Sequence, residues 1–221
     1  MSELMSIGAV LFDMDGTLVD TDEHWHAAEV ATFDHYGVAW TAEDHANLLG
    51  VPVVPATAYM LKKLSGDLSY DEVSTRMMDN LTARLHAHDI AWRPGARELL
   101  DRLREAGIAT ALVTASKMPL VDGVFHDVHK LGFATVVTGD DVPVTKPDPA
   151  PYLLALKRMG LTAGQAVACE DSATGVRAAL DAGLRVIAIP HLVPLTTEPG
   201  MVTLAGLDEI TLPFLHALVS A

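Results

Sequence analysis

Cysteine, basic residues, aromatic side chains and long apolar runs are all scarce in this sequence of 221 residues. A single cysteine, Cys169, excludes a disulfide framework and is typical of a reducing compartment. Fifteen basic residues against 29 acidic ones give a net charge of −14, which repels phosphate backbones. The first apolar run ends at Phe12 and no basic segment precedes it, unlike a signal peptide or a membrane span. We therefore expect a cytoplasmic protein with no nucleic-acid, membrane or obligate protein partner.

Half of the residues are apolar, which is enough for a sizeable core. Five short apolar runs predict strands that are buried on both faces, as in a parallel sheet. These runs are 7–12, 108–113, 134–138, 165–169 and 185–189. Helical patterns, each followed by a glycine, separate the later runs at 97–106, 152–159 and 173–182. The alternation predicts an α/β, doubly wound parallel-sheet (Rossmann-like) core.

The alternation stops between the first and second predicted strands. Residues 20–92 contain no convincing strand, and helical patterns lie near 23–36, 55–64 and 71–88. A crossover between parallel strands needs only a dozen or so residues, so an insert of this length predicts a separate domain. We expect a separate, all-helical inserted domain at 20–92, a core domain at 1–19 and 93–221, and hinges near 19–22 and 91–94.

Polar clusters follow four of the predicted strands. They are Asp13 and Asp15, then Thr114, then Lys146, and last Glu170 and Asp171. Because the carboxyl ends of parallel strands meet at one edge of a sheet, these side chains should converge there. Crowded carboxylates require a countercharge, and Mg²⁺ prefers such oxygen ligands together with phosphate oxygens. The set is suited to binding a phosphoryl group, with one aspartate free to attack phosphorus.

These residues resemble a known family. The segment Asp13-Met14-Asp15-Gly16-Thr17, the Thr114 loop, Lys146-Pro147 and Glu170-Asp171-Ser172 resemble, in order, the four motifs of the haloacid dehalogenase-like (HAD) phosphatases. The resemblance extends over essentially the whole chain, and the helical insert resembles a C1-type cap. It implies a Mg²⁺-dependent phosphatase acting on a small phosphomonoester, most similar to the sugar-phosphate phosphatases and β-phosphoglucomutase.

The resemblance also assigns roles to individual residues. Asp13 resembles the nucleophile and a metal ligand. Asp15 resembles the general acid and base, with its backbone carbonyl on the metal. Asp171 resembles the third protein ligand of Mg²⁺, and Glu170 completes the acidic metal shell. The phosphate-binding residues are Thr114, Ala115 and Lys146, although many relatives carry Asn or Ser where Ala115 stands.

The predicted cap offers three candidate residues for substrate recognition, Trp25, Gly50 and Val53. Phosphosugar mutases of the family carry His at the position aligned with Trp25 and Arg at the position aligned with Val53. Both are missing here, so a second phosphate would lose its cationic contact. A sugar-phosphate phosphatase is therefore favoured over a β-phosphoglucomutase-like mutase, which remains the alternative within the family.

Other classes fit less well. A phospho-accepting receiver module also gathers acidic residues, Thr and Lys at a sheet edge, but it has no long insert and no role for Asp15. A nicotinamide-binding Rossmann enzyme is excluded because no G-x-G-x-x-G follows a predicted strand. The ten histidines show no convergent set of three or four, which disfavours zinc.

Overall fold

The computed structural model describes residues 7–64 and 66–220, so residues 1–6, 65 and 221 of the predicted domains lie outside it. The chain divides into two compact units. The sheet unit comprises the described residues up to Asp20, Ala91–Met118 and those from Asp127 on. The helical unit comprises Thr21–Ile90 and Pro119–His126. The sequence had not indicated that 119–126 group with the helical unit. Within the described ranges, no helix combines the length and apolarity needed to cross a membrane.

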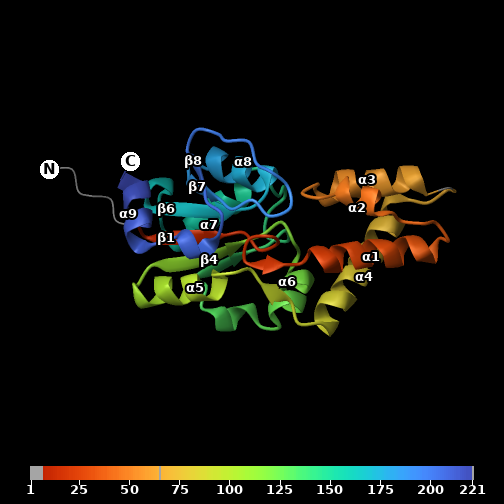
Figure 1. The fold of residues 1–221 in the computed structure, drawn as a ribbon, viewed down its shortest axis with the longest axis horizontal. Helices are drawn as coiled ribbons and strands as arrows, with labels where there is room; N and C mark the ends of the chain where they lie inside the picture. The colour runs from red at the N-terminus through yellow and green to blue at the C-terminus, as the bar shows by residue number, and fades with distance from the viewer. Residues whose placement is uncertain (1–6, 65, 221) are drawn as a thin grey trace. The chain divides into compact units, whose positions relative to one another are not determined.

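The sheet unit is built on a parallel sheet whose order matches a doubly wound fold (Figure 1). Across the sheet the strands are Thr135–Val137 (β5), Ala109–Val113 (β4), Ala9–Phe12 (β1), Ala166–Glu170 (β6), Arg185–Ala188 (β7) and Met201–Thr203 (β8). The first five confirm the predicted strands. The short β8 was not predicted, because its three residues show no distinct apolar run. Central strand β1 lies between β4 and β6, which places the topological switch point beside it.

Helices cover both faces of this sheet (Figure 1). They are Ala96–Glu105 (α5), Ala150–Met159 (α7), Ala173–Asp181 (α8) and Leu212–Ser220 (α9). Helices α7 and α8 contact each other, and their buried side chains Tyr152 and Val176 pack in one core cluster with Leu11 of β1. Helix α5 contacts β4 from the opposite side of the strands. The core thus holds the strand ends rigidly, which is what a site at the sheet edge requires.

The chain leaves and re-enters the sheet unit through two short strands that pair with each other. Val19–Asp20 (β2) is antiparallel to Ala91–Trp92 (β3). The backbone N–H of Arg93 donates to the carbonyl of Leu18 at 2.8 Å, which continues the pairing. The segments predicted as hinges therefore form a small ribbon, which fixes the spacing between the outgoing and the returning chain.

The helical unit confirms the three helices predicted between 23 and 88. Its helices are Asp22–His35 (α1), Ala42–Ala46 (α2), Val53–Lys63 (α3) and Tyr70–Ala87 (α4), and most of Met118–Phe125 (α6) belongs to it. Helix α4 contacts both α1 and α3. Phe33, Met60, Met77 and Leu81 are buried in this unit. The short α2 was not predicted because it spans only five residues, and α6 was not predicted because Pro119 and Gly123 are poor helix formers.

Asp44 ties two helices of this unit together. Its carboxylate accepts hydrogen bonds from Thr41, from the Tyr59 hydroxyl at 2.9 Å and from the Lys63 ammonium. Burial alone would raise the pKa of Asp44, but these donors hold that pKa well below its ordinary value. A lowered pKa in the folded state stabilises the protein above the ordinary carboxyl pKa. This contribution is lost as the pH falls through the folded value.

We expect Asp44→Ala to lower the free energy of unfolding by about 2 kcal/mol at pH 7, because three donors lose a charged acceptor. Urea titrations of both proteins would measure the difference. The difference should shrink below about pH 4, where the unfolded chain takes up the proton. If the difference in the free energy of unfolding did not change with pH, Asp44 would not be ionised in the folded protein.

Candidate active site

The predicted polar clusters lie at the carboxyl edge of the sheet. Phe12 of β1 pairs in register with Leu112 of β4 and with Cys169 of β6. Asp13 therefore follows β1 level with Glu170, the last residue of β6. The backbone N–H of Asp13 donates to the carbonyl of Cys169 at 3.1 Å, which continues the strand pairing by one residue. The register of three parallel strands thus positions the Asp13 side chain at the centre of the edge.

Lys146, on the loop between β5 and α7, joins these strand ends. Its buried ammonium donates to Asp13 Oδ1 at 2.6 Å, to Glu170 Oε1 at 2.5 Å and to the carbonyl of Val113 at 2.8 Å. Burial alone would lower the pKa of Lys146, but the carboxylates of Asp13 and Glu170 outweigh it and hold that pKa above its usual value. The side chain therefore stays protonated and presents a fixed positive charge beside Asp13.

Glu170 is fully buried and its carboxylate is held on both oxygens. Oε1 accepts from Lys146 and from the Tyr152 hydroxyl, each at 2.5 Å, and Oε2 accepts from Ser172 at 3.3 Å. A Cβ atom on Gly175 would lie 1.9 Å from Oε2, so only glycine leaves room for this carboxylate. Burial raises the pKa of Glu170 to about 7, partly offset by Lys146. The sequence did not indicate that Tyr152 contacts the site, because a tyrosine on an amphipathic helix is expected to be a core residue.

Asp15 is oriented by the loop that follows β4. The hydroxyl of Ser116 donates to Asp15 Oδ2 at 2.9 Å. The same loop is fixed by Thr114, whose backbone N–H donates to Val137 and whose Oγ1 accepts from the N–H of Ser116. Thr114 is buried, whereas the predicted phosphate-binding residue Ala115 is exposed. The hydrogen bond from Ser116 to Asp15 was not predicted from the motif.

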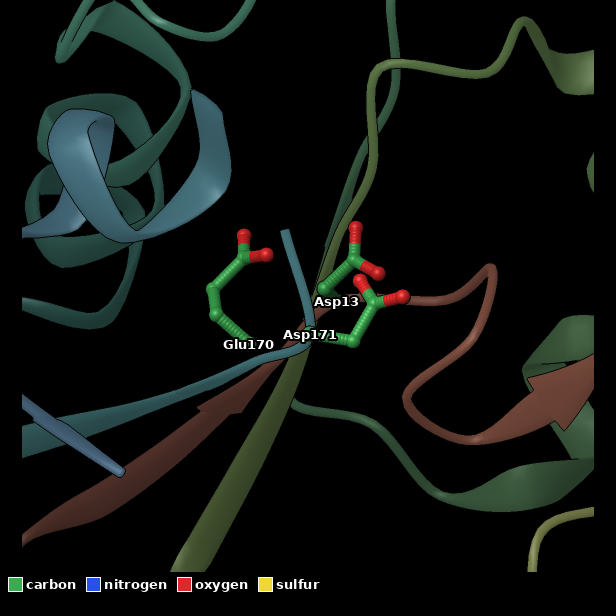
Figure 2. Close-up of side chains that lie close together, drawn as sticks. All are labelled: Asp13, Glu170 and Asp171. Carbon is green, nitrogen blue, oxygen red and sulfur yellow. The ribbon is translucent and has the colours of Figure 1, made fainter. Parts of the chain in front are cut away.

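Asp171 completes an acidic group with Asp13 and Glu170. One carboxylate oxygen from each lies within 4.8 Å of the others. Figure 2 shows the Asp13 and Asp171 carboxylates next to each other, with the Glu170 carboxylate apart from them. Burial, and then the charges of Asp13 and Glu170, raise the pKa of Asp171 well above its ordinary value. A Cβ on Gly16, which has a φ of +77°, would lie 2.0 Å from Asp171 Oδ2, so this approach requires glycine.

This donor set fits a divalent cation. Its three members offer only carboxylate oxygens, the ligands that a hard divalent cation prefers. Burial and the neighbouring carboxylates raise the pKa of Asp171 despite the nearby Lys146, and a bound cation would offset this crowding of negative charge. The two donors on Glu170 Oε1 leave Asp13 and Asp171 as the side chains better placed to bind it.

The predicted recognition residues all belong to the helical unit. Trp25 is half-buried in the first turns of α1. Gly50 is exposed in the loop between α2 and α3 with a φ of +70°, where a side chain would be strained. Val53, the first residue of α3, is 38% exposed. The nearby Val51 and Val54 are also exposed, at 37% and 67%. The segment 51–54, where the loop runs into α3, therefore presents apolar rather than cationic side chains.

Comparison with known proteins identifies a family. Residues 10–189 match the haloacid dehalogenase-like hydrolases. Protein CbbY from Cereibacter sphaeroides is 34% identical over 195 residues, which cover 83% of this chain and 84% of that protein. The phosphorylated carbohydrates phosphatase of Thermotoga maritima is 31% identical over 210 residues, which cover 91% of this chain and 95% of that protein.

The fold is also found in solved structures. A crystal structure of a CbbY mutant from Rhodobacter sphaeroides in complex with xylulose-(1,5)bisphosphate superposes with a TM-score of 0.79 at 32% identity. The match covers 92% of this chain and 96% of that chain. The sheet-edge motifs, the family match and these relatives agree with the resemblance drawn from the sequence.

Proposed function

The chain belongs to the haloacid dehalogenase-like hydrolase family, in which it is a phosphatase, and we propose that it hydrolyses sugar phosphates through an aspartyl-phosphate intermediate. Membership of a hydrolase family across residues 10–189 decides against a receiver-type signalling module. The names of the relatives support the substrate class, because the Thermotoga maritima protein is a phosphatase of phosphorylated carbohydrates.

One observation carries the mechanism. The Lys146 ammonium lies 2.6 Å from Asp13 Oδ1, and the carboxylate of Asp15, two residues along, is separately held by Ser116 at 2.9 Å. Lys146 directs Asp13 and offers positive charge to a phosphoryl group that approaches it. Asp15 accepts a hydrogen bond from Ser116, and we assign it a different task. Nucleophilic attack and proton transfer each require a carboxylate, and Asp13 and Asp15 supply the two.

The proposed reaction has two steps. An oxygen of Asp13 attacks phosphorus, the ester P–O bond breaks, and Asp15 gives its proton to the leaving sugar oxygen. Asp15 then takes a proton from water, the water oxygen attacks the phosphorus of the aspartyl-phosphate, and inorganic phosphate leaves with Asp13 restored. Lys146 and the hydroxyl of Thr114 bind phosphoryl oxygens in both steps.

Asp13 and Asp171, with the backbone carbonyl of Asp15, would hold a Mg²⁺ ion at this edge. A bound Mg²⁺ supplies positive charge for the phosphoryl oxygens, as in other phosphoryl-transfer enzymes. Glu170 remains the countercharge of Lys146. Without that countercharge, the buried ammonium would pair with Asp13 alone.

The cap predicted at 20–92, most of which lies in the helical unit, is proposed to recognise the leaving group through Trp25, Gly50 and Val53. Trp25 offers an apolar face of the kind that packs under a sugar ring. A mutase must bind a bisphosphorylated intermediate while that intermediate turns round in the site, which requires a cation for the distal phosphate. The exposed Val53 offers no such charge. Water should therefore take the phosphoryl group from Asp13.

A panel of phosphorylated metabolites assayed with Mg²⁺ tests this function. We expect phosphate release from hexose 6-phosphates or related monoesters. We expect no conversion of β-glucose 1-phosphate to glucose 6-phosphate, even when a glucose bisphosphate primer is added. Primed isomerisation faster than phosphate release would make the mutase interpretation correct. No phosphate release from any sugar phosphate would refute the proposed substrate class.

A further inference from the structure

Tyr152 contacts the catalytic network without taking part in the steps above. Its side chain is fully buried on α7, and its hydroxyl donates to Glu170 Oε1 at 2.5 Å. The same oxygen accepts from Lys146, whose ammonium also lies 5.2 Å from the centre of the Tyr152 ring. Tyr152 therefore touches both partners of the ion pair that directs Asp13.

We propose that Tyr152 is a positioning residue that keeps Glu170 turned toward Lys146 and away from the Asp13–Asp171 pair. The inference rests on the proposed function and names a further residue for it. With two donors on Oε1, the carboxylate is fixed on the side of Lys146, and Figure 2 shows it apart from the other two carboxylates.

The distances make the alternative orientation accessible. A Glu170 oxygen already lies within 4.8 Å of oxygens of Asp13 and Asp171, so a small rotation would bring it to a cation held there. The other oxygen accepts from Ser172 at 3.3 Å, which is a long hydrogen bond. Loss of the tyrosine hydroxyl would therefore weaken the hold on Glu170. The cation would attract Glu170, and Lys146 would lose one of its two carboxylate partners.

A merely structural role is the competing explanation, since a buried tyrosine hydroxyl needs an acceptor wherever it lies. The chain provides a matched control. Tyr59 also donates to a buried carboxylate, that of Asp44, which also binds a lysine, Lys63. Tyr59→Phe and Tyr152→Phe each remove one hydroxyl from a Lys-bound carboxylate and keep the ring. Only the second change lies at the active site.

The first measurement is the split between kcat and KM. Tyr152→Phe should lower kcat about tenfold or more and change KM less than about twofold. The reason is that Glu170 loses a hydrogen bond, and Glu170 helps to position the lysine that directs Asp13. Tyr59→Phe should lower the melting temperature but leave kcat unchanged. If Tyr152→Phe also changes only the melting temperature, its role is structural and the inference is wrong.

The second measurement is Mg²⁺ binding by calorimetry without substrate. Because a freed Glu170 adds a negatively charged ligand, Tyr152→Phe should bind Mg²⁺ several-fold more tightly than wild type while its kcat falls. Unchanged or weaker binding would overturn the proposal. This readout needs no turnover, so it remains informative even if wild type proves to hydrolyse no sugar phosphate.

The wild-type protein offers a third test if Tyr152→Phe does not fold. The chain has four tyrosines, and labelling their Cζ atoms with ¹³C gives one NMR signal for each hydroxyl environment. The Tyr152 signal should keep its position when Mg²⁺ is added. A shift that shows loss of the hydrogen bond would mean that Glu170 turns to the metal, contrary to the proposal.

Discussion

Replacement of Asp13 by asparagine should reduce phosphate release by on the order of 10⁴-fold or more, because an amide cannot attack phosphorus. The substitution keeps the shape of the side chain and an oxygen that can still accept from Lys146. Lys146 also keeps Glu170 and the carbonyl of Val113, so the fold should persist. Phosphate release and a thermal unfolding curve for each protein would separate the two effects.

Asp101→Asn is a suitable control. Asp101 is exposed on α5, where it pairs with Arg104, and the same chemical change there should leave activity unaltered. A folded Asp13→Asn protein with wild-type activity would falsify the aspartyl-phosphate mechanism. Quenching a reaction with radiolabelled substrate in acid should further show label on the wild-type protein and none on the variant.

The sequence predicted the sheet because each buried strand is a short apolar run that ends at a polar residue. Such runs are distinct when both faces of a strand are covered, as with β1 and β6, whose residues are all buried. Strand β8 was not found, because its residues are only half-buried or exposed. The grouping of 119–126 with the helical unit depends on tertiary packing. No local pattern encodes it.

The site was predictable as far as strand order determines it. Asp13, Thr114, Lys146 and Glu170 each stand just beyond a predicted strand or in the loop after it, so parallel topology alone brings them together. The contacts of Tyr152 and Ser116 were not predictable, because they depend on the direction of individual side chains. The sequence also grouped Glu170 with the metal ligands. That assignment stays a prediction: one Glu170 oxygen lies within 4.8 Å of oxygens of Asp13 and Asp171, while Oε1 accepts from Lys146 and Tyr152.

Removal of divalent metal should abolish activity, and Mg²⁺ should restore it better than Ca²⁺. Asp13 and Asp171 offer a compact oxygen site, which suits the short bonds of Mg²⁺ at about 2.1 Å. Ca²⁺ takes more ligands at longer distances, about 2.4 Å, and would displace Asp13 from its position beside Lys146. Full activity after exhaustive treatment with EDTA would contradict a metal requirement.

The same metal should change how stability depends on pH. The raised pKa values of Glu170, about 7, and of Asp171 mean that their ionisation opposes folding. In the metal-free protein, the contribution of these two groups to stability should therefore be most favourable below the ordinary carboxyl pKa and be lost as the pH rises through the raised values. Mg²⁺ stabilises the ionised carboxylates, so the rise in melting temperature on adding it should be larger at pH 8 than at pH 5. Asp171→Asn should remove most of that rise at pH 8, whereas Asp101→Asn should leave it intact. An equal rise in both variants would place the ion elsewhere.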